Sequence, residues 1–94
     1  MKCKFEVGML YLTQGIQILV EEKDLGEEIG QCLMRHHQGD WGELCDEDKQ
    51  EHDYAVEHEG RLLSAYEIGE DKTKIWIITE WDRSVTTILL PEEY

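Results

Sequence analysis

Five residues of types used in catalysis could meet around one short turn near the C-terminal end of the chain. Glu80, Asp82 and Arg83 lie in or beside this turn, between two runs rich in β-branched residues. Paired carboxylates with an arginine can carry acid–base or phosphate chemistry, and His36 or Asp40 could join them if a helix packs over this end. The same residues could instead form a structural network, because Asp and Ser in tight turns bond their own backbone and Arg83 could bridge Glu80 or Asp40. The sequence leaves both a small enzyme or ligand-binding module and a structural turn open.

Motifs of the larger enzyme classes do not occur in the sequence. It contains no Gly-rich phosphate loop, no Gly-x-Ser-x-Gly elbow and no His-Glu-x-x-His pair. We therefore assign no catalytic residue and favour a non-enzymatic protein, with a small enzyme or ligand-binding module centred on the Glu80-Asp82-Arg83 turn kept open as the alternative.

A second group has the residue types of zinc ligands. Four such residues fall within fourteen positions, namely Cys32, His36, His37 and Cys45. The Cys-x-x-Cys and His-x₃-His spacings of zinc sites are not present, and Cys32 falls on an apolar stripe where a buried thiol needs no other role. We therefore expect no metal and no cofactor.

Acidic residues concentrate in the middle of the chain. Between positions 40 and 59, nine acids stand against Lys49, a net charge of −8 within a chain of −13. The nine are Asp40, Glu43, Asp46, Glu47, Asp48, Glu51, Asp53, Glu57 and Glu59. On a helix, such carboxylates project in rows and could replace duplex phosphates on a DNA-binding protein. The alternative is a solvated acidic face that keeps a small domain soluble.

Apolar spacing predicts two or three helices before position 60. Thr13 has the position of an N-cap for a helix over 14–22, and Asp24 with Glu27 resembles a capping box for a helix over 25–37. The inward stripe of the second helix is Leu25, Ile29, Cys32, Leu33 and His36. A third helix is expected from Asp46 or Asp48 to Glu59, with few apolar residues and a wide face in water. Trp41, between two glycines, is expected to pack against the helices and to donate its indole N–H to a carbonyl.

The rest of the chain predicts strands. Residues 61–68, 73–81 and 85–90 are joined by short turns, which makes them antiparallel neighbours, and residues 1–12 alternate loosely as an edge strand. The expected fold class is α+β, with two or three N-terminal helices packed on a three- or four-stranded antiparallel β-meander. Trp81 and Tyr94 at an exposed edge leave open a third role, that of a structural or oligomerising protein.

Composition limits the remaining possibilities. Ninety-four residues suit one domain, 1–94, and the excess of 22 acidic over 9 basic residues argues against direct binding of nucleic acid or anionic membranes. Three cysteines without regular spacing do not suit a disulfide framework, and no apolar run approaches about 18 residues. We expect a cytoplasmic protein without signal peptide or membrane span, whose partner, if any, is basic.

Several short motifs resemble one known group of proteins. They are Arg35-His36, GDWG (39–42), RLLSAY (61–66), IWIITE (75–80), DRS (82–84), Thr86-Thr87 and LLPEEY (89–94). The pattern, over roughly residues 7 to 94, resembles a family of small proteins from bacteria, plasmids, integrative elements and phages. Its members are variously labelled hypothetical, plasmid-related or type I restriction methylase subunit. Trp81 stands where this family usually has a small residue, and Cys45 where it has an acid or a small polar residue.

The resemblance implies a mobile-element setting. Small acidic proteins of such a setting are similar in kind to anti-restriction and anti-CRISPR proteins, many of which occupy a basic groove on a defence complex. We therefore expect a non-enzymatic, DNA-mimicking inhibitor whose acidic residues 40–59 meet a basic host protein.

Overall fold

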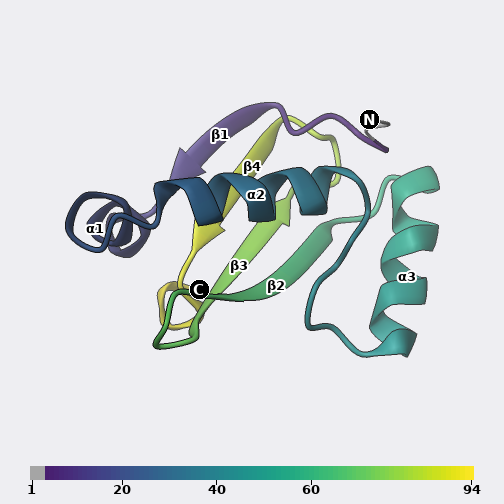
Figure 1. The fold of residues 1–94 in the computed structure, drawn as a ribbon. Helices are drawn as coiled ribbons and strands as arrows, with labels where there is room; N and C mark the ends of the chain where they lie inside the picture. Colours follow the sequence, from purple (N-terminus) through teal and green to yellow (C-terminus); the bar gives the residue numbers. More distant parts are fainter. Residues whose placement is uncertain (1–3) are drawn as a thin grey trace.

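The computed structural model describes residues 4–94 and contains a four-stranded sheet with helices mainly on one side (Figure 1). Its strands are β1 (Met9–Leu12), β2 (Leu62–Ile68), β3 (Thr73–Thr79) and β4 (Val85–Leu89), in the order β1-β4-β3-β2. The α+β class and the antiparallel β2-β3-β4 meander are confirmed. Of the expected N-terminal strand over 1–12, residues 1–3 lie outside the described part of the chain.

The expectation that a fourth strand would also be antiparallel is wrong. β1 pairs with β4 in parallel, with Met9 opposite Val85 and Leu12 opposite Ile88. All three helices and two strands lie between them along the chain, so no hairpin constrains their relative direction.

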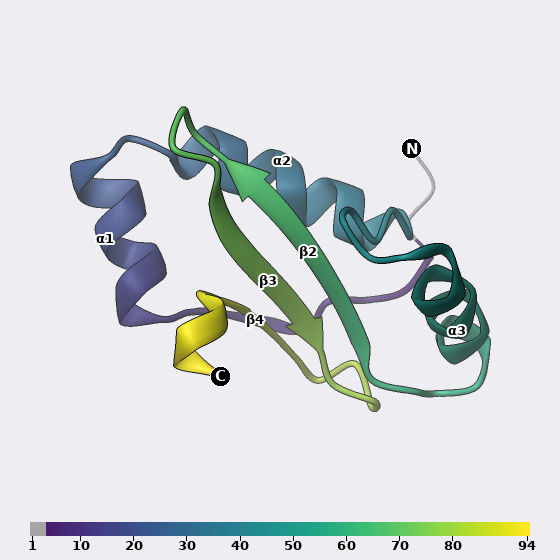
Figure 2. The ribbon, with the colours of Figure 1, turned by 90° about the horizontal axis from the view of Figure 1, so that it is seen from below.

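Three α-helices precede the meander: α1 (Gln14–Glu22), α2 (Gly26–His37) and α3 (Asp46–Glu57). Figure 2 shows α2 on one side of the sheet and the short C-terminal 3₁₀ turn η1 (Pro91–Glu93) on the other. The core between helices and sheet contains Ile16, Ile29, Cys32, Tyr66, Ile68, Ile75, Ile77 and Ile88. The predicted stripe of α2 is confirmed, since Ile29, Cys32 and His36 are buried while Leu25 and Leu33 pack at the margin. Within residues 4–94, every helix is too short or too polar to span a membrane.

The helix starts differ from the capping predictions. Thr13 is the N-cap of α1, but its hydroxyl donates to Glu93 Oε1 at 2.5 Å and makes no capping bond to its own helix. Glu93 Oε2 instead accepts the first-turn N–H of Gly15 at 3.0 Å, so a residue far along the chain supplies the cap.

Neither predicted aspartate cap forms. Asp24 has a φ of +54°, a left-handed conformation that Asp tolerates, and lies between the helices, while Leu25 is the N-cap of α2. The N-cap of α3 is Cys45, one residue before Asp46. The acids of α3 instead occupy its first turn, where they favour the positive end of the helix dipole.

Trp41 anchors a second, smaller core. Phe5, Trp41 and Leu62 are buried together, and the α3 side chains Ala55 and Val56 pack against them. The predicted packing of Trp41 is confirmed, but its Nε1 donates to Asp53 Oδ1 at 2.9 Å and not to a carbonyl. The indole therefore binds α3 directly.

The residues beside Trp41 also cover the outer edge of β2. Gly42 forms a parallel bridge with Ala65, and the Glu43 N–H donates to the Ala65 carbonyl at 2.7 Å. Gly42 has a φ of +71°, and a Cβ at this position would lie 2.0 Å from the Ala65 oxygen. Only glycine fits this close approach.

Candidate acidic binding surface on helix α3

Helix α3 lies beside the sheet, next to β2 (Figure 1). None of its residues is fully buried, and it packs through Ala55 and Val56 on the small core of Phe5, Trp41 and Leu62. The prediction of a shallowly packed third helix is confirmed. Most of its circumference faces solvent, so its side chains can reach a partner without a change of fold.

All nine acids predicted for the binding surface are exposed, but two of them have structural roles. Asp40 pairs with Arg35 at 2.8 Å and accepts the Gly42 N–H at 3.1 Å, and both bonds lower the pKa of its carboxyl. Asp53 accepts the Trp41 indole N–H. These two carboxylates hold the loop and α3 in place.

The other seven carboxylates make no ion pair with a described residue. They are Glu43, Asp46, Glu47, Asp48, Glu51, Glu57 and Glu59. A basic surface could therefore bind them without breaking an ion pair of residues 4–94. They remain the candidate partner-binding set.

An exposed aromatic residue lies within this acidic surface. Tyr54 is 65% exposed and, with Glu47, Gln50 and Glu51, lines a shallow hollow of about 450 Å³. Its ring stacks on His58 with centroids 3.7 Å apart and planes 6° apart. Tyr54 was not among the predicted site residues, although its four-residue spacing from His58 places both on one helix face.

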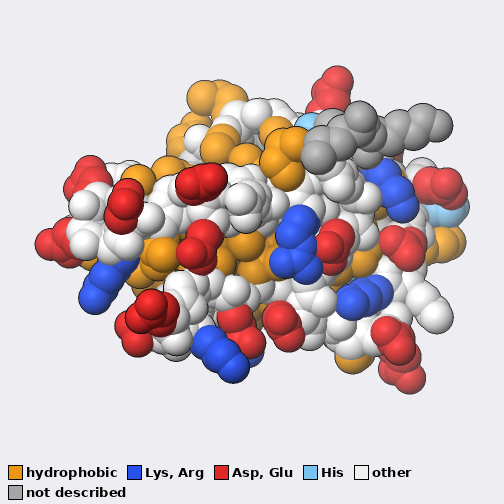
Figure 3. Space-filling view, viewed as in Figure 1, with side chains coloured by type: hydrophobic (Ala, Val, Ile, Leu, Met, Phe, Trp, Pro, Cys, Tyr) orange, Lys and Arg blue, Asp and Glu red, His pale blue; other side chains and the backbone are white. Residues whose placement is uncertain are grey.

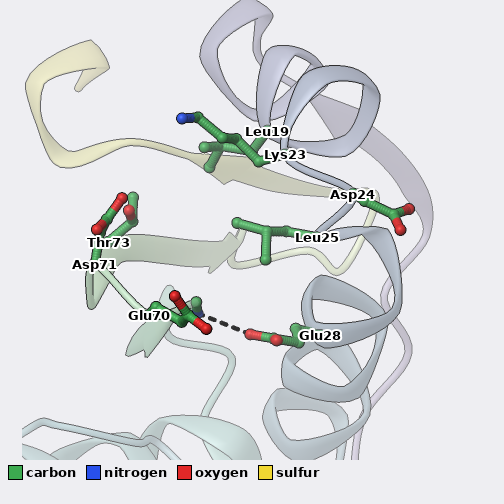
Figure 4. A pocket seen from close by; sticks show the side chains of 9 residues that line it. Leu19, Lys23, Asp24, Leu25, Glu28, Glu70, Asp71 and Thr73 are labelled. Carbon is green, nitrogen blue, oxygen red and sulfur yellow. Dashed lines mark hydrogen bonds between the residues drawn. The ribbon is translucent and has the colours of Figure 1, made fainter.

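Acidic side chains are not confined to α3. Figure 3 shows them spread over the face that carries α1 and α2, with basic side chains interspersed. A hollow of about 420 Å³ between the α1–α2 loop and the β2–β3 turn is lined by Asp24, Glu28, Glu70 and Asp71, with Lys23 among them (Figure 4). There Glu28 Oε2 accepts the Gly69 N–H at 2.8 Å, so this carboxylate serves to hold the turn.

The histidine of the alternative pocket is enclosed in the core. His36 is 0% exposed, with Nδ1 2.5 Å from Ser64 Oγ and Nε2 2.9 Å from Thr79 Oγ1. Thr79 continues the chain of hydrogen bonds to Thr86 at 2.7 Å, and Thr86 donates to the Val7 carbonyl at 2.7 Å. Burial lowers the pKa of His36 to about 3, so the ring is neutral at pH 7.

Arg83 binds backbone carbonyls. Its Nη1 donates to the carbonyls of Gly60 at 2.6 Å and Glu80 at 3.0 Å, and its Nη2 donates to that of Ala55 at 2.9 Å. Burial lowers the pKa of the guanidinium. Arg83 thus joins the β3–β4 turn to the last turn of α3.

The carboxylates near this turn have other partners. Asp82 Oδ1 accepts both the N–H and the hydroxyl of Ser84, which lowers its pKa, and the Glu80 carboxylate pairs with Arg61 at 3.4 Å. The five residues of the alternative pocket therefore each have a local structural partner. This arrangement favours the structural interpretation of the turn over an enzymatic one.

The possible zinc ligands are dispersed. Cys32 is buried between α2 and the sheet, which raises the pKa of its thiol, whereas Cys45 is exposed before α3. His36 uses both ring nitrogens in the core. Within residues 4–94, no three His, Cys, Asp or Glu side chains are placed to hold a metal ion together.

Comparison with known proteins gives no family for the chain: no protein-family model, no curated protein and no solved structure matches it.

Proposed function

We propose that this protein is a non-enzymatic acidic binding protein that uses α3 to occupy a basic, nucleic-acid-binding surface of another protein. The single observation that carries the proposal is the set of seven exposed carboxylates on and beside α3 without an ion-pair partner among the described residues. Carboxylates that lack internal partners keep their full attraction for an external cation.

The charge density of α3 suits a mimic of DNA. Its twelve residues carry six acids and one lysine over a length of about 18 Å. Duplex DNA has one charge per about 1.7 Å, or about ten over the same length. With a net charge of −5, the helix reaches about half this density. The flanking acids Glu43 and Glu59 lengthen the acidic surface beyond the helix.

The attachment of α3 also favours binding, because a fixed helix loses little conformational entropy when a partner docks. The Trp41 indole bonds Asp53 within the helix, and Arg83 bonds the Ala55 carbonyl near its end. The carboxylates are therefore presented on a rigid support.

The motif resemblance supplies the biological setting of the proposal. A small acidic protein of plasmids, phages or integrative elements would act in the cytoplasm of its host. Its partner would be a host defence complex, of restriction or CRISPR type, whose basic groove normally holds nucleic acid. The inhibitor would then exclude the nucleic acid by occupying that groove.

Affinity purification from the native host, followed by mass spectrometry, tests this function. We expect a basic nucleic-acid-binding protein among the partners, released by salt and by competing duplex DNA. The triple variant Glu47→Gln, Glu51→Gln, Glu57→Gln should lose at least about tenfold in affinity.

A matched control changes the same net charge elsewhere. Glu21, Glu22 and Glu70 are exposed residues outside α3, and their replacement by Gln should leave most of the affinity intact. Equal affinity of the α3 variant and the parent protein would refute the proposal.

A further inference from the structure

Tyr54 presents an aromatic ring to solvent from the outer side of α3. The residue is 65% exposed, and it lines the hollow of about 450 Å³ together with Glu47, Gln50 and Glu51. These residues precede Tyr54 by seven, four and three positions, so all four side chains share one face of the helix. A soluble acidic helix does not need an exposed aromatic ring among its carboxylates, whereas such a ring attracts cations.

His58 holds the Tyr54 ring in place. The two ring planes are 6° apart with centroids at 3.7 Å, so the imidazole covers one face of the phenol ring. The His58 Nδ1 lies 2.9 Å from the Tyr54 carbonyl oxygen, to which the Nδ1–H of a neutral imidazole donates. Side chains of a helix lean towards its N-terminus, which places His58 over Tyr54 and the second face of Tyr54 towards the hollow. This second face is therefore fixed before a partner arrives.

The carboxylates of the hollow supply negative charge beside the ring. Glu47 and Glu51 are one helical turn apart, and neither makes an ion pair with a residue of 4–94. A cation that enters the hollow meets two carboxylates and one face of an aromatic ring. The hollow is therefore complementary in charge to a basic side chain.

Arginine fits this hollow better than lysine does. A planar guanidinium can lie on an aromatic ring while its N–H groups donate to a carboxylate, whereas an ammonium group is a compact and strongly hydrated charge. The chain itself contains such an arrangement. The Arg35 guanidinium lies 4.7 Å from the centroid of the Tyr66 ring, and it pairs with Asp40 at 2.8 Å.

The same arrangement occurs a second time, where Arg61 meets the C-terminal residue. The Arg61 guanidinium lies 5.3 Å from the centroid of the Tyr94 ring, and it pairs with Glu80 at 3.4 Å. Both ion pairs among residues 4–94 therefore combine an arginine and a carboxylate with a tyrosine ring. On α3, Tyr54 and its neighbouring carboxylates supply two of these three groups, and no arginine of residues 4–94 supplies the third.

We propose that the hollow beside Tyr54 binds an arginine side chain of the basic partner. The guanidinium lies on the free face of the Tyr54 ring and donates to Glu47 or Glu51. The proposal rests on the function proposed for α3 and adds to it the residue type that α3 recognises. Attraction by charge alone would treat arginine and lysine alike, whereas an aromatic wall between carboxylates distinguishes them.

Two peptides of equal charge, tri-arginine and tri-lysine with blocked termini, test the preference. Chemical shifts of the α3 amides, followed by NMR at low salt, give the Kd of each peptide at this site. We expect the parent protein to bind tri-arginine more tightly than tri-lysine. Replacement Tyr54→Leu should reduce this preference by about two- to fivefold, because the cation then has no aromatic face to contact.

Two further variants separate the ring from other effects. Tyr54→Phe keeps the aromatic ring and should keep the preference for arginine. Tyr11→Leu removes an exposed tyrosine from β1, at the opposite end of the sheet from β2 and α3, and should also leave the preference unchanged. Circular dichroism should be the same for all three variants, because both tyrosines are exposed.

Two results would overturn the inference. One is an equal Kd of the two peptides for the parent protein, and the other is an undiminished preference for arginine in Tyr54→Leu. Failure of the function proposed for α3 gives a different result, since the variant with Gln at 47, 51 and 57 would then capture the host partner as well as the parent protein does. The arginine site can thus be refuted while the acidic binding surface stands.

Discussion

Arg83 Nη2 donates a hydrogen bond to the Ala55 carbonyl at 2.9 Å and thereby joins a turn of the sheet to the last turn of α3. Two further bonds from the same guanidinium reach Gly60 and Glu80. The position of the acidic helix therefore depends on a residue outside it.

Replacement of Arg83 by Ala should destabilise the fold by about 2–4 kcal/mol, because three backbone carbonyls lose a charged donor. Chemical denaturation measures the loss, and hydrogen exchange should show faster opening at the C-terminal end of α3. Arg83→Lys retains a charge but not the forked geometry, so its free energy of unfolding should lie between those of the parent protein and Arg83→Ala. An Arg83→Ala variant as stable as the parent protein would contradict this role.

The stability of the protein should fall as the pH drops from about 6.5 towards 3 because of His36. In the folded state its pKa is about 3, against an ordinary value of 6.5, so the unfolded chain binds the proton first. The contribution of neutral His36 to the free energy of unfolding is fully present above pH 6.5. Between pH 6.5 and 3 it decreases by up to about 1.4 kcal/mol per pH unit.

The variant His36→Asn isolates this effect, since its side chain is polar but does not titrate. Although it is less stable at pH 7, its free energy of unfolding should depend less on pH between 6.5 and 4 than that of the parent protein. Urea denaturation at several pH values measures the difference. Parallel pH profiles for the two proteins would contradict the assignment.

Removal of the Glu93 carboxylate should destabilise α1. Glu93 accepts bonds from Thr13, Gly15 and Leu90, which lower the pKa of its carboxyl. Loss of a helix cap costs about 0.5–2 kcal/mol, and the exposure of Glu93 places Glu93→Ala at the lower end. This contribution is lost as the pH falls below the ordinary range of a glutamate. Thermal melting should show a lower Tm for Glu93→Ala than for the neighbouring control Glu92→Ala.

The two described cysteines should differ in reactivity. In a Cys3→Ser background, Cys45 should react with a thiol reagent in the native protein, because it is exposed. Cys32 is buried and its pKa is raised, so it should react only after unfolding. The test counts thiols with and without denaturant, and rapid reaction of both in the native protein would contradict the packing of Cys32.

Local patterns predicted much of the fold. The β-branched runs separated by short turns gave the meander, and the spacing of Ile29, Cys32 and His36 gave the buried face of α2. The acidic surface was also readable, because consecutive charges on a helix with few apolar residues must face water. Each of these features depends on residues close together in the chain.

Contacts between distant residues were not predictable in the same way. The hydroxyl of Thr13 meets Glu93, and nothing in the sequence near either residue indicates the other. The parallel pairing of β1 with β4 likewise arises from packing across the whole domain. His36 was placed on the correct helix face. Its bonds to Ser64 and Thr79, however, depend on strands β2 and β3, and the ring therefore lies in the core and not in a candidate site.

The cover that Trp41–Glu43 provides for the outer edge of β2 limits how the chain can aggregate. An uncovered strand edge is a template on which further chains can add, and a fibre needs such an edge at both ends of the sheet. Here the β2 edge is paired at its middle residue, because the Ala65 N–H donates to the Trp41 carbonyl and the Ala65 carbonyl accepts the Glu43 N–H. A further strand could add to the middle of β2 only by displacing these two hydrogen bonds, so the cover hinders growth of the sheet at this edge.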